Sequence, residues 1–155
     1  MTPSELRKDV IAPTLAMLPY RQRNAGAALL LAAAMQASGI TRARSSEARG
    51  LWRMTAASVD AVLKNSVSAE LAIAACEARD VKPQAAAIMQ EFGRGDGLAC
   101  EFAALLLLSE RAPLPLLGDE EGAWGVYKRL WTPGKPDRKR WSQSYQDALQ
   151  VITNS

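Results

Sequence analysis

The chain has 155 residues, 48% of them hydrophobic, and a formal net charge of +3. This length and composition fit a single domain spanning residues 1–155, with enough apolar side chains to bury a core. The sequence has no histidine, which excludes Ser-His-Asp and Cys-His catalytic sites and histidine-bearing metal sites. No metal or other cofactor is therefore expected. The mild positive charge suits an anionic partner such as cell-wall polymer, and it is too scattered to favour nucleic acid.

The residue composition predicts an all-α fold. Ala and Leu, which are strong helix formers, are abundant, and runs of strand-favouring residues are nearly missing. Two very apolar runs, Ala25–Met35 and Leu98–Leu108, are shorter than the roughly 20 residues that a membrane-spanning helix needs. We interpret both runs as central core helices and expect no membrane span. No secretory signal is seen, so synthesis in the cytoplasm of a bacterial host is expected.

Helix-start signals divide the chain into short helices joined by brief links. Thr2 and Glu5 form a capping box, and Pro13 is expected to kink or divide the first helix. Gly39 is expected to end the second helix with a positive φ. The remaining starts are expected at these positions: Asn24, Thr55, Ser66 or Ser68, Lys82–Pro83, Asp96, Asp119 or Glu120, and about Asp137.

The region 40–54 has no helical periodicity, and it contains Gly50 with several arginines and serines. It is interpreted as a loop that includes a small irregular hairpin. Trp52 lies in this polar stretch, next to Arg49 and Arg53. One interpretation places Trp52 in a binding groove, with the two arginines holding a carboxylate or phosphate. The other makes Trp52 a lid on the core, with solvated arginines beside it.

Five aromatic residues in the last third of the chain form two helical stripes. The favoured interpretation is that the stripes pack on each other and close the core. The alternative is that one or two rings line a groove. The two cysteines, Cys76 and Cys100, are interpreted as small buried residues. The stripes consist of Trp124, Tyr127 and Trp131 on one helix and Trp141 and Tyr145 on the next.

Several segments resemble small phage-encoded proteins of a lysozyme-like, lytic-transglycosylase-like type. The resemblance implies a compact lysozyme-like α domain whose partner is the glycan strand of peptidoglycan. It also implies action on the cell wall or association with a virion. The segments that carry it span most of the chain: Thr2–Arg7, Gln36–Ser38, Ala48–Trp52, Leu98–Leu108, Ala123–Tyr127 and Trp131–Pro136.

The chain departs from the family at the polar positions of its pattern. In that pattern the helix ends Gln-Glu-Ser, and the loop reads Ala-Arg-Gly-aromatic-Trp-Gln-Phe-Glu. The first Glu falls on Ala37, the Gln on Arg53 and the last Glu on Thr55. Ala37 alone would fit an engineered inactivating change, whereas all three departures together indicate natural divergence. One expectation is a domain that binds the glycan strand of peptidoglycan, either as an enzyme that cleaves it with another acid or as a pseudoenzyme that binds without cleaving. A non-catalytic protein that kept the fold and binds a host or virion protein is the alternative.

The site residues that follow are one candidate acid and a set of groove residues. Glu47 is the best available acid for cleavage, although its arginine neighbours lower a carboxyl pKa, which is the wrong direction for a general acid. An ordinary solvated charge is the competing role for Glu47. The expected groove residues are Gln36, Ser38, Arg49, Trp52 and Arg53.

Overall fold

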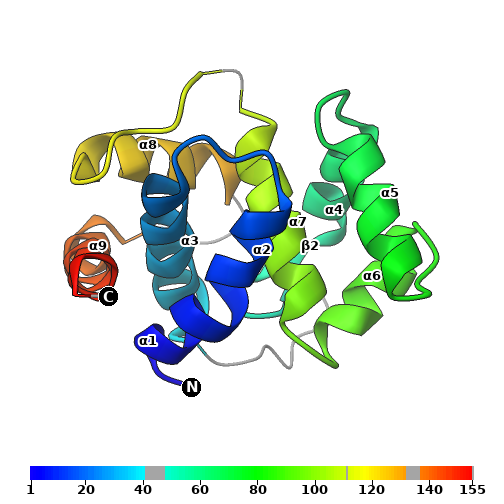
Figure 1. Ribbon diagram of the computed structural model, residues 1–155, viewed down its shortest axis with the longest axis horizontal. Helices are drawn as coiled ribbons and strands as arrows, with labels where there is room; N and C mark the ends of the chain where they lie inside the picture. Colours follow the sequence, from blue (N-terminus) through cyan, green and yellow to red (C-terminus); the bar gives the residue numbers. More distant parts are fainter. Residues whose placement is uncertain (41–47, 111, 132–136, 155) are drawn as a thin grey trace.

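The protein is mostly α-helical, with one small antiparallel sheet of two strands (Figure 1). The structure, a computed structural model, describes residues 1–40, 48–110, 112–131 and 137–154. This confirms the predicted helical class and the small hairpin. The elements are α1 (Pro3–Leu6), a π-helical turn (Arg7–Ile11), α2 (Ala12–Met17), α3 (Arg23–Ser38), β1 (Ala48–Arg49), β2 (Met54–Thr55), α4 (Ala56–Lys64), α5 (Ala69–Ala78), α6 (Ala85–Phe92), α7 (Gly97–Leu108), α8 (Glu120–Leu130) and α9 (Arg138–Thr153).

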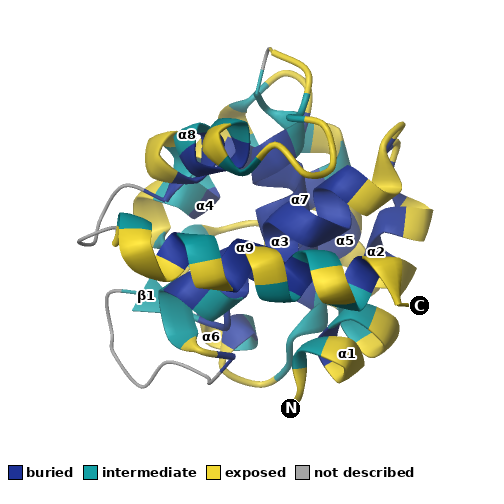
Figure 2. Ribbon diagram, turned by 90° about the vertical axis from the view of Figure 1, so that its left-hand side faces the viewer, coloured by how far each residue is buried: buried dark blue, intermediate teal, exposed yellow. Residues whose placement is uncertain are grey.

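Two helices that are apolar on nearly every side, α3 and α7, form the centre of the fold. In Figure 1, α7 lies between α3 on one side and α4, α5 and α6 on the other, and it packs against all four. α9 packs along α3, and in Figure 2 it shows buried and exposed residues in alternation. The two apolar runs thus form core helices, as expected. In the described residues, no helix combines the length and the apolar character needed to cross a membrane.

The first helical segment is distorted where the sequence predicts a break. Thr2 caps α1, and the reciprocal hydrogen bonds with Glu5 complete the capping box. The π-helical turn Arg7–Ile11 then separates α1 from α2. Pro13 is in the first turn of α2, where its missing N–H leaves no donor for an i→i−4 bond. The expected division is therefore present: the chain changes from a π-helical turn to the α-helix α2 just before Pro13.

The sheet follows α3 in the chain and folds back onto the core. Ala48 pairs with Thr55, and Arg49 pairs with Met54. Gly50 has a φ of +78°, and a Cβ added there would lie 3.3 Å from the Cβ of Ala99. The turn needs glycine both for its backbone conformation and for this close approach to α7.

The aromatic stripes of α8 and α9 pack on each other, as the favoured interpretation predicted. The ring centroids of Tyr127 and Trp141 are 4.9 Å apart, and those of Trp124 and Trp141 are 5.7 Å apart. Trp131 stacks on Tyr127, and Tyr145 lies against Trp141. All five rings are buried, so they close the core rather than line a groove.

Two predicted helix boundaries are wrong. α3 begins at Arg23 with Gln22 at its N-cap, so Asn24 lies inside the helix instead of capping it. α6 begins at Ala85, because Lys82 accepts a hydrogen bond from the Gln84 amide in a turn that precedes the helix. In both cases a strong local start signal is displaced by one to three residues.

Candidate functional site

Trp52, the aromatic residue expected in a groove, is fully buried. Its exposed fraction is 0%, and its indole N–H donates to the carbonyl of Leu30 in the middle of α3, at 2.8 Å. The indole N–H of Trp131 donates in turn to the backbone carbonyl of Trp52, at 3.0 Å. The groove interpretation of Trp52 is therefore corrected. The ring packs in the core because its one polar atom has a partner there.

The end of α3 uses its polar side chains within the protein. The Gln36 side-chain amide donates to the carbonyl of Asp137 at 3.1 Å. Ser38 Oγ donates to the carbonyl of Ala34 and accepts from the Ile40 amide. Ala37 is half-buried in the last turn. Gln36 and Ser38 thus hold the helix end, and their predicted role in a groove stays a prediction.

Arg49 and Arg53 flank the turn of the hairpin, and they differ in what they contact. Arg53 has a φ of +50°, and its guanidinium donates to the carbonyl of Gly50 at 3.1 Å. Burial lowers the pKa of Arg53 from its ordinary value. Arg49 is half-buried, and its guanidinium has no ion-pair or hydrogen-bond partner among the described residues. Of this pair, Arg49 is therefore the one whose guanidinium has no partner in the described part of the chain and could pair with an anion.

A surface hollow of about 700 Å³ lies between the sheet, the start of α4 and the start of α6. Arg49 supplies its charged side chain, and Thr55 supplies a hydroxyl that is already paired with Ser58. The rest of the wall is apolar and mostly small. The lining residues are Arg49, Thr55, Ala56, Ala57, Ala85, Ala86 and Met89.

The backbone makes the hollow more favourable for an anion. Ala56 and Ala57 are in the first turn of α4, and Ala85 and Ala86 are in the first turn of α6. The N-terminal turn of a helix carries a partial positive charge from its unpaired amides. Two such turns therefore add to the charge of Arg49. The small alanine side chains leave room for a ligand group to approach these turns.

Two carboxyl groups of the described residues have pKa shifts in the direction opposite to that which a general acid for glycoside cleavage needs. Glu47, the candidate acid, lies outside the described residues. The pKa values of Glu5 and Glu120 both lie below their ordinary value. Hydrogen bonds from Thr2 lower the pKa of Glu5, and those from Gln146 and Arg138 lower the pKa of Glu120. A general acid for glycoside cleavage needs the opposite shift.

The cysteines are buried, as predicted, and they are poorly suited to nucleophilic chemistry. Burial raises the pKa of Cys76, and it raises the pKa of Cys100 to about 12. A thiol attacks as its thiolate, so a raised pKa makes each cysteine less reactive near neutral pH. The cysteines therefore belong to the core of the fold.

Sequence reasoning found one charged residue of the hollow and missed most of its wall. Arg49 was singled out, whereas Ala56, Ala85 and Met89 were not. Ala85 and Met89 are on α6, which is distant from the hairpin in the sequence and lies beside it in the folded chain. The available signal was a pair of alanines at each of two helix starts, and such pairs are too common to indicate a site.

Comparison of the chain with models of known protein families, with curated proteins and with solved structures found no match.

Proposed function

We propose that this protein is a lysozyme-like domain of phage origin that binds the glycan strand of peptidoglycan, with the hollow beside the sheet as its contact site. One observation carries the proposal: Arg49 is half-buried in the wall of that hollow and unpartnered among the described residues. A partly buried cation without a partner gains most when an anion reaches it. The peptide stems on a glycan strand carry carboxylates that match an arginine in charge and shape.

The order of the elements supports the lysozyme-like part of the proposal. A buried helix, α3, ends at Gly39, the short sheet β1–β2 follows, and α4 begins directly after it. The segments on which the family resemblance rests, Gln36–Ser38 and Ala48–Trp52, occupy the end of that helix and the sheet with its turn. The hydrogen bond from Trp52 to Leu30 fixes the turn against α3. The sheet is therefore held in a defined place beside the hollow.

Binding without cleavage is the form of the function that we propose, because Ala37 stands where the resembled pattern has its acid. Cleavage is tested by incubating purified sacculi with the wild-type protein and with Glu47→Gln, and measuring released muropeptides. We expect no release from either. Release by the wild type that is lost in Glu47→Gln would identify an enzyme with Glu47 as its acid.

Binding is tested by sedimentation with purified sacculi. We expect the wild-type protein to co-sediment, and Arg49→Ala to bind at least about tenfold more weakly, because a hydrogen bond to a charged group contributes about 1.5–3 kcal/mol. Arg94→Ala is the matched control, since Arg94 is exposed in the turn between α6 and α7. The proposal fails if the wild type does not co-sediment.

Soluble ligands separate the carboxylate contact from recognition of the sugar. Muropeptides carry stem carboxylates, whereas chitooligosaccharides have a similar sugar backbone and no carboxylate. We expect titration to show tighter binding of the muropeptide, and we expect Arg49→Ala to remove that preference. Equal affinity for both ligands would leave glycan binding intact and assign Arg49 no part in it.

The alternative function is a non-catalytic protein that kept this fold and binds a host or virion protein. The loss of the family's polar pattern at Ala37, Arg53 and Thr55 favours it. It predicts that the protein does not bind sacculi and that a single purified host or virion protein binds it. Trp52→Ala is unsuitable as a probe of such a contact, because Trp52 is in the core.

A further inference from the structure

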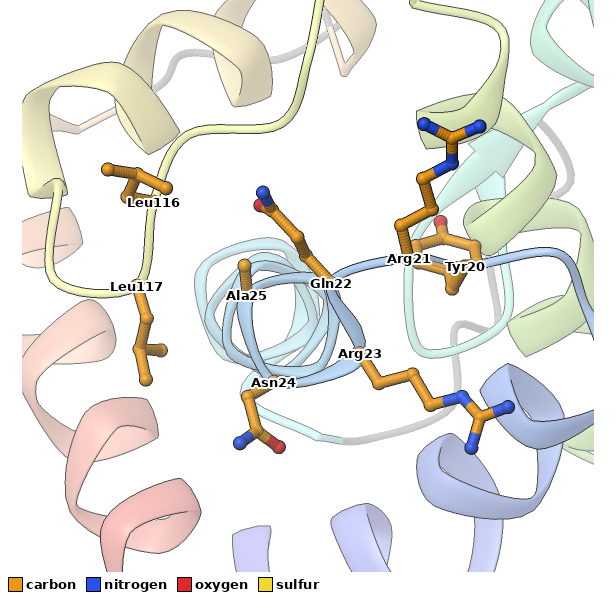
Figure 3. A pocket seen from close by; sticks show the side chains of 8 residues that line it. All are labelled: Tyr20, Arg21, Gln22, Arg23, Asn24, Ala25, Leu116 and Leu117. Carbon is orange, nitrogen blue, oxygen red and sulfur yellow. The ribbon is translucent and has the colours of Figure 1, made fainter.

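A second hollow lies at the opposite end of α3, away from the C-terminal end on which the family resemblance rests. Figure 3 shows α3 nearly end-on, with Leu116 and Leu117 on one side of its first turn and Arg21 and Arg23 on the other. A neighbouring hollow shares Tyr20, Arg21 and Gln22 and continues the surface toward the end of α7. We call the surface formed by residues 20–25, Leu116 and Leu117 the α3-start surface.

The apolar side of this surface is held open by the backbone. Leu116 is 69% exposed and Leu117 is 40% exposed, and the two are consecutive in the chain. The Asp119 amide donates to the carbonyl of Leu116 at 2.9 Å, and the Gly118 amide donates to the hydroxyl of Tyr145 at 3.0 Å. This bonded turn keeps the leucines at the surface. A partner that covers them gains the hydrophobic contribution without first ordering the turn.

The other side of the surface carries two arginines that form no ion pair within the described part of the chain. Arg21 and Arg23 are exposed, and neither has an ion-pair partner among the described residues. Other arginines of the structure do have such partners, as Arg138 has in Glu120 and Arg129 has in Glu110. The first turn of α3 contains no acidic residue. Glu110, which lines the neighbouring hollow, is paired with Arg129, so no carboxylate of the described residues forms an ion pair with Arg21 or Arg23 at a helix start that normally favours negative charge.

We propose that the α3-start surface docks an acidic, amphipathic segment of a protein partner. Apolar side chains of the segment cover Leu116 and Leu117, while its Glu or Asp side chains pair with Arg21 and Arg23. The charge on one side of the helix end and the leucines on the other match two faces of one such segment. This surface is separate from the hollow at Arg49, so the inference does not depend on glycan binding.

A protein segment fits this surface better than a nucleic acid does. Single-stranded nucleic acid binds where aromatic side chains stack on its bases. The aromatic residue of this surface, Tyr20, is buried, and its hydroxyl donates to the carbonyl of Ala104. The exposed side chains opposite the arginines are aliphatic, and they offer nothing to a phosphate. The leucines thus favour a partner that is apolar as well as acidic.

The probe is a labelled amphipathic helical peptide with leucines along one face and glutamates along the adjacent face. Two matched peptides replace its glutamates by lysines or its leucines by serines. Titration by fluorescence anisotropy is combined with amide chemical-shift mapping of the protein. We expect the acidic peptide to bind at least about tenfold more tightly than either matched peptide. The shifts are expected at residues 21–25 and 116–118.

Two pairs of substitutions test the two sides of the surface separately. Arg21→Glu with Arg23→Glu, and Leu116→Ser with Leu117→Ser, are each expected to weaken the acidic peptide at least about tenfold. Arg94→Glu and Val67→Ser are the controls, because both residues are exposed elsewhere, and they are expected to bind as the wild type does. Circular dichroism of each variant verifies the fold.

Three outcomes would overturn the proposal. The first is no binding of the acidic peptide by the wild type. The second is equal binding of the peptide that carries lysines. The third is full binding by the leucine variant, with competition by polyphosphate or an oligonucleotide, which would make the surface a general anion site for another class of ligand.

Discussion

The two ends of α3 differ in how completely the rest of the chain satisfies them. At the C-terminal end, Gly39 adopts the left-handed conformation and its amide donates to Met35, while Gln36 bonds across to Asp137. At the N-terminal end, Gln22 makes no capping bond, and neither Arg21 before the helix nor Arg23 in its first turn has an ion-pair partner among the described residues. The C-terminal end is thus bonded into the fold, apart from the buried Gln36 Oε1, which has no hydrogen-bond partner among the described residues. The N-terminal end instead has its unmatched charges at the surface, where a partner can reach them. A surface that can bind a partner is located by polar and charged groups whose hydrogen bonds and ion pairs are not formed within the protein, more than by likeness of sequence.

Trp52→Ala is expected to have the largest effect, and it tests how firmly the hairpin is anchored to α3. The ring is fully buried against α3, and its indole N–H bonds to Leu30. We expect the free energy of unfolding to fall by about 3–5 kcal/mol, because removing a buried aromatic ring leaves a cavity. Urea denaturation followed by circular dichroism measures it. Leu116→Ala, at the exposed end, is the control and should change stability by less than about 0.5 kcal/mol. A small loss in Trp52→Ala would mean that the hairpin is not anchored through this ring.

Alkaline pH should destabilise the packing around two buried tyrosines, Tyr20 and Tyr127. Burial raises the pKa of Tyr20, whose hydroxyl bonds to Ala104, and it raises the pKa of Tyr127 to about 12. The unfolded chain loses these protons first, near pH 10. The stability that these two tyrosines contribute is therefore fully present below about pH 10 and falls above it, by up to about 1.4 kcal/mol per pH unit for each tyrosine.

Tyr20→Phe separates the contribution of Tyr20 from that of Tyr127. Denaturation midpoints measured across the alkaline range should fall less steeply in this variant than in the wild type. Tyr127→Phe should also reduce the slope, because the pKa of Tyr127 is raised as well. The same slope in Tyr20→Phe and the wild type would contradict a role for the Tyr20 hydroxyl in the pH dependence.

Gly26→Ala tests how closely the start of α3 packs. A Cβ at Gly26 would lie 2.7 Å from the ring of Tyr20, which its bond to Ala104 holds in place. Alanine raises helix propensity by up to about 1 kcal/mol, and overpacking costs about 1–3 kcal/mol. We expect a net loss of about 1–2 kcal/mol in thermal or urea denaturation. Gly125→Ala in α8 is the control, with its nearest neighbour 3.5 Å away, and it should be neutral or stabilising. A stabilised Gly26→Ala would show that Tyr20 is free to move.

Local signals in the sequence were sufficient for most helix ends and for the hairpin. The Thr2–Glu5 capping box, the positive φ of Gly39 and the caps by Thr55 and Asp119 are all found in the structure. Each of these depends on residues within three or four positions in the chain. The start of α3 was misjudged: Gln22 is at the N-cap without a side-chain cap bond, and Asn24 lies inside the helix.

The candidate sites were harder to predict because burial and pairing are properties of the folded chain. The sequence left open whether Trp52 is in the core or in a groove, and the partners that decide it, Leu30 and Trp131, are far along the chain. Whether Arg49 has a partner within the described residues likewise depends on which acids fold close to it. Arg21 and Arg23 carried no motif at all. A helix start with arginines and no acid is the one signal that could have drawn attention to them.

The smallest expected effect is the change in stability caused by Arg23→Glu. It tests whether the arginines at the start of α3 reduce stability in favour of binding. Arg23→Glu places an acid in the first turn of α3, where the helix dipole favours it, so the free energy of unfolding should rise by about 0.3–1 kcal/mol at low salt. The gain in stability should shrink as salt increases, because salt screens the interaction between the exposed glutamate and the helix start. Urea denaturation at two salt concentrations measures it, with Arg94→Glu as the control outside a helix start. A variant that is more stable and has lost the acidic peptide would show that the arginines reduce stability in favour of binding. If Arg23→Glu destabilises the protein instead, Arg23 makes a stabilising contact, and the contrast between the two ends of α3 no longer holds.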